Sequence, residues 1–194
     1  DSLTEQFGIR SLEFSPEFGF KLNGKKIFLQ GNANHHDLGA LGATCYDKAI
    51  ERMMLQLKSF GYNCIRCSHN PYSDSFARIA DRVGILVVDE LTDKWSDNDY
   101  WGGRQPFTHI WHKLITEWIK RDRNRPSIIL WSIGNEIDYP NDPYCHPLFE
   151  TMTGNNDANK PAKERQYDPN KPNAEQLSVI AKELAAIVRT QDTT

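Results

Sequence analysis

The sequence has few cysteines, no long hydrophobic run and no large excess of charge, and each lack excludes a class of protein. Its 194 residues carry a net charge of −3, so we expect no basic surface of the kind that binds nucleic acid. No apolar run approaches the ~18 residues of a membrane span, so no membrane partner is expected. The chain opens without the basic and apolar leader that directs secretion. These lacks leave a globular protein with enough chain for a sizeable core.

The four cysteines are too few for a disulfide scaffold. Cys64 and Cys67 form a C-x-x-C pattern, which redox and zinc sites use. Here the pattern lies in a β-type run, where residues three apart point to opposite faces, and not at a helix N-terminus. We therefore expect free thiols that are at least partly buried.

The hydrophobic pattern alternates between short apolar strands and amphipathic helices. Asn23-Gly24, between two alternating runs, predicts a hairpin within the first 29 residues. Segments 94–107 and 138–173 predict loops. Beyond the hairpin, the predicted strands are residues 26–31, 62–67, 85–89 and 127–133, and the helices that follow them are residues 47–60, 74–82, 108–123 and 174–190.

This order indicates an α/β fold with a parallel sheet covered by helices. An open doubly wound sheet and a closed (β/α)8 barrel both satisfy it. No G-x-G-x-x-G follows the first strand, which counts against the dinucleotide-binding version of the open sheet. Four βα units are half of an eight-unit barrel, so the pattern is consistent with half of a TIM barrel.

Polar residues follow each predicted strand, at the point where it ends. In a parallel α/β structure these carboxyl ends converge on one face, where such folds place their active sites. A helix cap or a turn explains any one cluster, but four clusters together indicate a site. The clusters contain His35, His36 and Asp37, then Arg66 and His69, then Asp89 and Glu90, and finally Asn135 and Glu136.

Glu136 is the strongest candidate for a catalytic residue. It follows a buried strand and Gly134-Asn135, so we expect a partly desolvated carboxyl of the kind that serves as a general acid. Asn135 can donate to a substrate hydroxyl. The pair suits glycoside hydrolysis, which needs a protonated carboxylic acid over the glycosidic oxygen. The alternative is a glutamate that caps a loop.

The histidines also raise metal-dependent hydrolysis as an alternative chemistry. A zinc site needs three or four convergent ligands. His35 and His36 are neighbours in an extended segment and point in opposite directions, so they cannot easily share one ion with His69. Histidine donors to sugar hydroxyls fit better, and we expect no metal and no other cofactor.

Two tryptophans in the loop at 94–107 are candidates for a sugar subsite. A sugar ring has an apolar face that can pack on an indole, so Trp95 or Trp101 could line such a subsite. Trp111 and Trp118 lie seven apart on one helix face and predict core packing instead.

Several longer motifs carry a resemblance to a known family. In this order, over residues 7–138, they resemble glycoside hydrolase family 2 and, within it, the β-galactosidase-like members. The motifs are Phe7–Arg10, Leu22–Lys25, His35–Ala43, Asn63–Pro71, Val87–Glu90, Arg121–Ile129 and Trp131–Glu136.

The resemblance implies a domain organisation and a reaction. Residues 13–194 would be the first half of a catalytic TIM barrel, and residues 1–12 the end of an immunoglobulin-like sandwich or its linker. The reaction would be retaining hydrolysis of a terminal β-linked sugar through a covalent glycosyl-enzyme. The stretch at residues 35–43 favours β-D-galactose, with β-glucuronidase and β-mannosidase as alternatives. The family's nucleophile, a second glutamate after the seventh strand, has no counterpart here, so we expect these 194 residues alone to be inactive.

The resemblance also implies roles for single residues. Glu136 matches the general acid/base and Asn135 the residue that contacts the sugar 2-hydroxyl. Lys94 stands near the place where some members carry an acidic magnesium ligand, which again predicts no required metal. The other candidate substrate-binding residues are His35, Asp37, Arg66, His69, Asp89, Glu90 and Trp95.

The remaining expectations concern partners and location. We expect an oligosaccharide or polysaccharide substrate, further domains of a parent protein, and homo-oligomers. Unpaired edges of the first and fourth strands predict self-association of the isolated chain. Carbohydrate scavenging favours the periplasm or the exterior of a bacterium. A non-catalytic sugar-binding relative that keeps the pocket is the second functional class.

Overall fold

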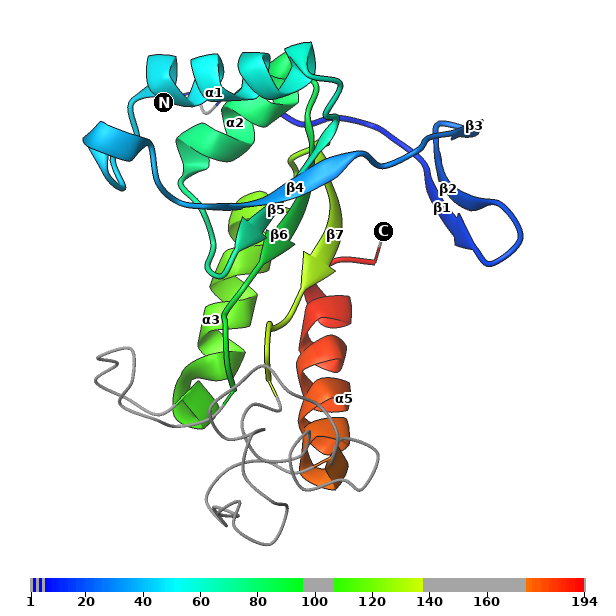
Figure 1. The fold of residues 1–194 in the computed structure, drawn as a ribbon. Helices are drawn as coiled ribbons and strands as arrows, with labels where there is room; N and C mark the ends of the chain where they lie inside the picture. Colours follow the sequence, from blue (N-terminus) through cyan, green and yellow to red (C-terminus); the bar gives the residue numbers. More distant parts are fainter. Residues whose placement is uncertain (1, 3, 5, 96–106, 138–173, 194) are drawn as a thin grey trace, which may run out of the picture.

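The computed structural model describes residues 2, 4, 6–95, 107–137 and 174–193, and strands and helices alternate along most of them (Figure 1). Trp101, Cys145 and the predicted loop at 138–173 lie outside the described residues. The strands are β1 Leu12–Ser15, β2 Gly19–Leu22, β3 Lys25–Lys26, β4 Gly31–His35, β5 Cys64–Ser68, β6 Leu86–Glu90 and β7 Ile128–Ser132. The helices are α1 Asp47–Ser59, α2 Asp74–Val83, α3 Phe107–Asp122 and α5 Ala174–Gln191, with a short 3-10 helix at Gly39–Leu41.

The parallel sheet has the strand order β4-β5-β6-β7, so each strand pairs with the next one along the chain. A helix separates each strand from the next and α5 follows the last, as Figure 1 shows. This is the order of the first four βα units of a barrel, as predicted. Within the described ranges, no helix is long and apolar enough to cross a membrane.

The helices form where the sequence supplies both an apolar face and end signals. Ile50 and Met54 lie four residues apart on α1 and are buried. The Ser73 hydroxyl accepts a hydrogen bond from the amide of Phe76 and begins α2. Gly84 takes the left-handed conformation at φ 74° and ends it. The predicted helix at residues 74–82 therefore agrees with α2 to within one residue.

The strands alternate their side chains between two different environments. Ile65, Cys67 and Val87 point to the helices and share a core with residues of α1 and α2. Arg66 and Glu90 point to the opposite face and bond to each other. The burial of Cys64 and Cys67 raises the pKa of both thiols, which are free and hold no disulfide. These are the buried thiols that the sequence predicted.

A small antiparallel sheet of β1, β2 and β3 packs on the face of the parallel sheet that the helices leave open. Asn23 and Gly24 turn the chain between β2 and β3 with φ angles of 52° and 73°. This confirms the hairpin predicted at Asn-Gly. Phe20 is buried against Cys64 and Ile129 at this contact, so the small sheet covers one end of the open face with apolar side chains.

The first strand of the parallel sheet corrects the prediction of residues 26–31. It runs over Gly31–His35, because Gly31 can approach β5 closely: a Cβ there would lie 2.8 Å from the Cys64 carbonyl oxygen. Asn32 and Asn34 belong to this strand and are bonded to each other at 2.6 Å. The strand therefore carries polar side chains, and a search for an apolar run misplaces it.

The segment that precedes β1 contacts the start of β7. The Arg10 guanidinium donates to the Ile128 carbonyl at 2.6 Å, and Gly8 packs directly on Pro126. Residues 7–10 form no strand in this structure. Their assignment to a sandwich domain, and the boundary at residue 12, stay predictions.

Candidate active site

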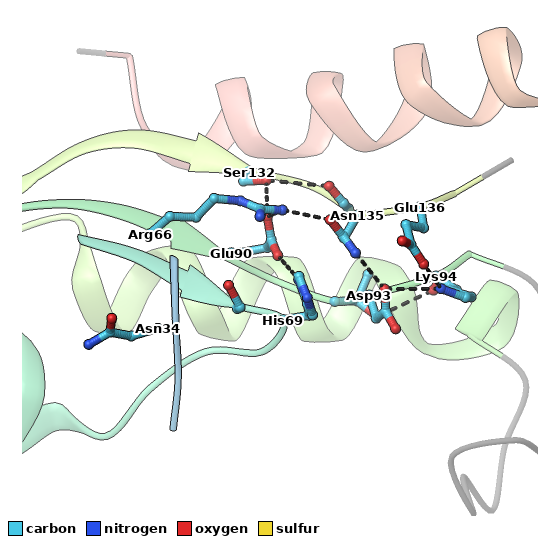
Figure 2. Close-up of polar contacts among 12 residues, drawn as sticks. Asn34, Arg66, His69, Glu90, Asp93, Lys94, Ser132, Asn135 and Glu136 are labelled. Atoms are coloured by element: carbon cyan, nitrogen blue, oxygen red, sulfur yellow. Dashed lines mark hydrogen bonds and ion pairs between the residues drawn. The ribbon is translucent and has the colours of Figure 1, made fainter. Parts of the chain in front are cut away.

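Glu90 lies at the end of β6 and is the centre of the polar cluster. Its side chain has no exposed surface. One oxygen accepts from Arg66 Nε at 2.9 Å and from the Ser132 hydroxyl at 2.7 Å. The other is 2.7 Å from His69 Nδ1. Figure 2 shows these contacts, which join β5, β6 and β7 at one edge of the sheet.

The bond to Glu90 sets the orientation of His69. A carboxylate is an acceptor, so Nδ1 carries the proton that is donated to Glu90. Nε2 is then the ring nitrogen that is left for a ligand. The ring of His35, from β4, lies edge-on to His69 with centroids 5.3 Å apart. The structure therefore brings His35, His69 and Arg66 together, as the sequence predicted.

The oxygen and the nitrogen of the Asn135 side-chain amide are both hydrogen-bonded. Its oxygen accepts from Arg66 Nη2 at 2.8 Å, and its nitrogen donates to Asp93 Oδ1 at 2.9 Å. The backbone N–H of Asn135 also donates to the Asp93 carbonyl at 2.8 Å. These three bonds fix the residue that immediately precedes Glu136.

Lys94 links the candidate acid to this network. Its Nζ lies 3.1 Å from Glu136 Oε2 and 3.2 Å from Asp93 Oδ1 (Figure 2). Burial lowers the pKa of Lys94, but its bonds to Glu136 and Asp93 outweigh burial and raise that pKa above its ordinary value. Burial likewise raises the pKa of Asp93, and bonds from Asn135 and Lys94 more than offset it. Both groups are therefore charged at neutral pH.

The environment of Glu136 corrects the expectation of a desolvated carboxyl. Its side chain is 64% exposed, whereas that of Lys94 is 12% exposed. Glu136 lies beyond the last residue of β7, on the segment that leaves the sheet. A residue in that place is reachable by a ligand.

Asp89 and Trp95 also differ from their predicted roles as substrate-binding residues. Asp89 precedes Glu90 in β6 and therefore points to the helices, where it accepts from the Trp118 indole at 2.6 Å. Trp95 is 2% exposed and donates to the Ile133 carbonyl at 2.7 Å. A Cβ on Gly134 would lie 2.8 Å from Trp95 Nε1, so the indole is packed beneath the end of β7. Trp95 supports the site and offers no face for stacking on a sugar.

The residues that follow His35 lie apart from the network. The Asp37 carboxylate accepts from the Gly39 amide at 2.5 Å and shapes the turn there. The His36 ring packs on Tyr72 with centroids 4.8 Å apart. In this structure Asp37 is exposed and holds a turn, and its predicted contact with a sugar hydroxyl stays a prediction.

The sequence did not single out Asp93, Lys94 or Ser132 as members of this network. Asp93 and Lys94 follow β6 by only a few residues, which is the signal that could have found them. Ser132 is the last residue of β7 and pairs with Glu90 in the sheet register. Among the residues that the structure describes, no group of three His, Cys, Asp or Glu side chains is placed to hold a metal ion.

The arrangement defines a class of protein. Four parallel βα units carry histidine, arginine, asparagine and carboxylate side chains at the carboxyl ends of neighbouring strands, which is where (β/α) barrels carry their catalytic residues. An accessible carboxyl beside donors for hydroxyl groups suits one half of the carboxyl pair that a glycoside hydrolase uses.

Comparison with known proteins identifies the family. The family model for the TIM barrel domain of glycosyl hydrolases family 2 matches residues 17–190. The chain belongs to glycoside hydrolase family 2.

Individual relatives agree with this assignment. Beta-galactosidase BoGH2A of Bacteroides ovatus is 41% identical over 138 residues, which are 71% of this chain and 16% of that protein. A crystal structure of a family 2 member from Bacteroides cellulosilyticus superposes with a TM-score of 0.72, at 40% identity, over 97% of this chain and 21% of that one. The beta-glucuronidase of Parabacteroides merdae also gives a TM-score of 0.72, at 25% identity, over 97% of this chain and 20% of that one. The chain thus spans about a fifth of the length of these proteins.

Proposed function

We propose that this chain forms part of a retaining, exo-acting glycoside hydrolase in which Glu136 is the general acid/base. The observation that carries the proposal is the placement of Asn135 and Glu136 at the end of β7. Asn135 is bonded to Arg66, and Glu136 stands next to it with an exposed carboxyl. A ligand at the strand ends therefore meets a fixed amide, the His69 imidazole and an accessible acid.

The reaction has two steps, and Glu136 serves in both. In the first, the Glu136 proton moves to the glycosidic oxygen as its bond to the anomeric carbon breaks, and a second carboxylate bonds to that carbon. In the second step, Glu136 accepts a proton from water, whose oxygen replaces the carboxylate on the anomeric carbon. In this proposal, the second N–H of the Asn135 amide donates to the hydroxyl next to that carbon.

The second carboxylate is not supplied by the two carboxylates closest to this network. Glu90 is buried and bonded through both oxygens, and Asp93 is bonded to Asn135 and Lys94. We propose that the nucleophile comes from a part of the barrel outside these 194 residues. The isolated chain is then expected to be inactive and, because β4 and β7 are open edges among the described strands, to self-associate. Light scattering and a glycosidase assay on the isolated chain check both expectations.

The charges of the described site favour a neutral sugar over a glucuronide. Between galactose and mannose we propose β-D-galactose, because residues 35–43 resemble the β-galactosidase-like members. A glucuronide carries a carboxylate on its sugar ring, and a cation that is not already paired with a protein carboxylate would favour its binding. Arg66 is already paired with Glu90, and Lys94 is paired with Asp93 and Glu136. The relatives include both classes, a beta-galactosidase at 41% identity and a putative beta-glucuronidase at 43% identity, so the preference rests on the residues of this chain.

The test uses the full-length protein that carries this chain. Hydrolysis of nitrophenyl β-galactoside, β-glucuronide and β-mannoside is compared for wild type, Glu136→Gln and Glu117→Gln. Glu117 is a matched control, because it is also 64% exposed and also faces a lysine. We expect preference for the galactoside. On the phenyl glycoside of the preferred sugar, whose poor leaving group needs an acid, we expect a loss of about 10²- to 10⁴-fold in Glu136→Gln alone.

Other outcomes would overturn parts of the proposal. Preference for the glucuronide or the mannoside would reject galactose and keep the family chemistry. An unchanged rate of Glu136→Gln on the phenyl glycoside would mean that the acid lies elsewhere. Binding of galactose without hydrolysis of any of the three substrates would make the protein a sugar-binding relative.

A further inference from the structure

The Glu136 carboxylate is held by a side chain from a different strand. Lys94 comes from the segment after β6, and its Nζ lies 3.1 Å from Glu136 Oε2. Within residues 6–95, 107–137 and 174–193, this is the polar contact that the Glu136 carboxylate makes. An exposed glutamate otherwise samples several rotamers, so the lysine decides where this carboxyl points.

Lys94 is itself fixed by its neighbours in the chain. Asp93 accepts two hydrogen bonds from Asn135, and Trp95 donates one to the Ile133 carbonyl. The residues on both sides of Lys94 are therefore tied to the end of β7. The Lys94 side chain is 12% exposed and is also bonded to Asp93. The ammonium cannot follow a moving carboxyl, so the carboxyl must adapt to the ammonium.

We propose that Lys94 is the positioning residue of the acid/base: it holds Glu136 Oε2 so that Oε1 carries the proton that goes to the leaving group. This inference rests on the proposed function of Glu136. An ammonium group has donors and no acceptor, so an oxygen that accepts from it is not the one that should be protonated. Lys94 thereby selects one of two chemically equivalent oxygens.

In the first step, which kcat/KM reports, the position of the acid matters only when the leaving group needs a proton. A phenyl glycoside has a poor leaving group and depends on the acid, whereas a 2,4-dinitrophenyl glycoside departs without one. A misplacement of a reacting group by about 1 Å can cost about 10²-fold. Loss of Lys94 should therefore slow the first substrate and spare the second.

The experiment measures kcat/KM of the full-length protein on phenyl and 2,4-dinitrophenyl glycosides of its preferred sugar. Lys94→Met removes the ammonium, Lys94→Gln keeps an N–H donor without charge, and Lys94→Arg keeps the charge. We expect Lys94→Met to lose about 10- to 10²-fold on the phenyl glycoside and less than about threefold on the other. Lys94→Arg should recover part of the loss. Lys113→Met, which removes an exposed ammonium on α3, is the matched control and should behave as wild type.

The outcomes separate this inference from the proposed function. Equal losses on both glycosides in all three Lys94 variants would make Lys94 a structural residue and overturn the inference. Wild-type rates in Lys94→Met and Lys94→Gln, with the phenyl rate lost in Glu136→Gln, would overturn it and leave the proposed function standing. A wild-type phenyl rate in Glu136→Gln would overturn the proposed function first. If Lys94→Met fails to fold, the Gln and Arg variants still allow the rates on the two glycosides to be compared.

Discussion

The ends of β6 and β7 each present a glutamate, and the two could hardly be placed more differently. Glu90 has no exposed surface and accepts from Arg66, His69 and Ser132. Glu136 is 64% exposed and is bonded to Lys94. A carboxylate whose oxygens are both occupied by buried donors holds other groups in place. A carboxylate with one oxygen held and one accessible can give and take a proton.

The largest expected effect on stability comes from a substitution of the buried glutamate, Glu90. Glu90→Gln removes the charge that compensates Arg66 and places an amide nitrogen where only an acceptor fits. We expect the free energy of unfolding to fall by about 2 to 4 kcal/mol. Urea denaturation checks this value. A variant as stable as wild type would show that Glu90 does not hold the strand ends together.

Asp89 is a second buried carboxyl to compare with Glu90. It lies next to Glu90 in the chain, but the charged group near it is another carboxylate, that of Asp122. Burial and the Asp122 carboxylate raise the pKa of Asp89 to about 8, whereas an unfolded aspartate has a pKa of about 4. The folded state keeps a proton that the unfolded state releases between these two values. Stability contributed by this group is therefore present at low pH and is lost as pH rises from about 4 to about 8.

Asp89→Asn should remove that dependence, since asparagine is neutral and can still accept from the Trp118 indole. We expect the stability advantage of the variant over wild type to grow between pH 5 and pH 7 by about 1.4 kcal/mol for each pH unit. Thermal unfolding at a series of pH values measures the difference. A constant gap between the two proteins at all pH values would contradict the assigned titration.

For the exposed glutamate, Glu136, we expect substitution to have a small effect on stability. Glu136→Gln keeps an oxygen for Lys94 and loses a charge that faces solvent, so the free energy of unfolding should change by less than about 0.5 kcal/mol. Urea denaturation beside Glu90→Gln gives the contrast directly. A loss as large as that of Glu90→Gln would remove the distinction between the two glutamates.

The smallest expected effect is that of metal removal. The described partner of Glu136 is an ammonium group, and we expect the full-length protein to keep its activity after dialysis against EDTA. Assays with and without added Mg²⁺ check this. Activity that is lost on dialysis and restored by Mg²⁺ would show that a metal ion is required.

Much of this site follows from strand periodicity, and the rest depends on contacts between loops. Arg66 and Glu90 share a face with the residues two positions away in their strands, and the alternation that separates Glu90 from Asp89 can be derived from the sequence alone. The pairing of Lys94 with Glu136 cannot be derived in this way. It depends on how the segment after β6 packs on the end of β7, and no local pattern records that packing. The burial of Trp95 was mispredicted for the same reason, and the exposure of Glu136 is set beyond the last residue of β7.

The apolar contact made by the small sheet has an electrostatic consequence for the whole site. Phe20, Cys64 and Ile129 form an apolar cluster on the open face of the parallel sheet, and Val88 packs against it. Cys64 and Val88 lie two residues before Arg66 and Glu90 on the same strand faces. The ion pair therefore rests on a layer of low polarizability, where charges interact more strongly than they do next to water. A hairpin outside the βα pattern thus adds apolar side chains to the sheet face that carries the site, and a polar side chain at residue 20 would weaken this contribution.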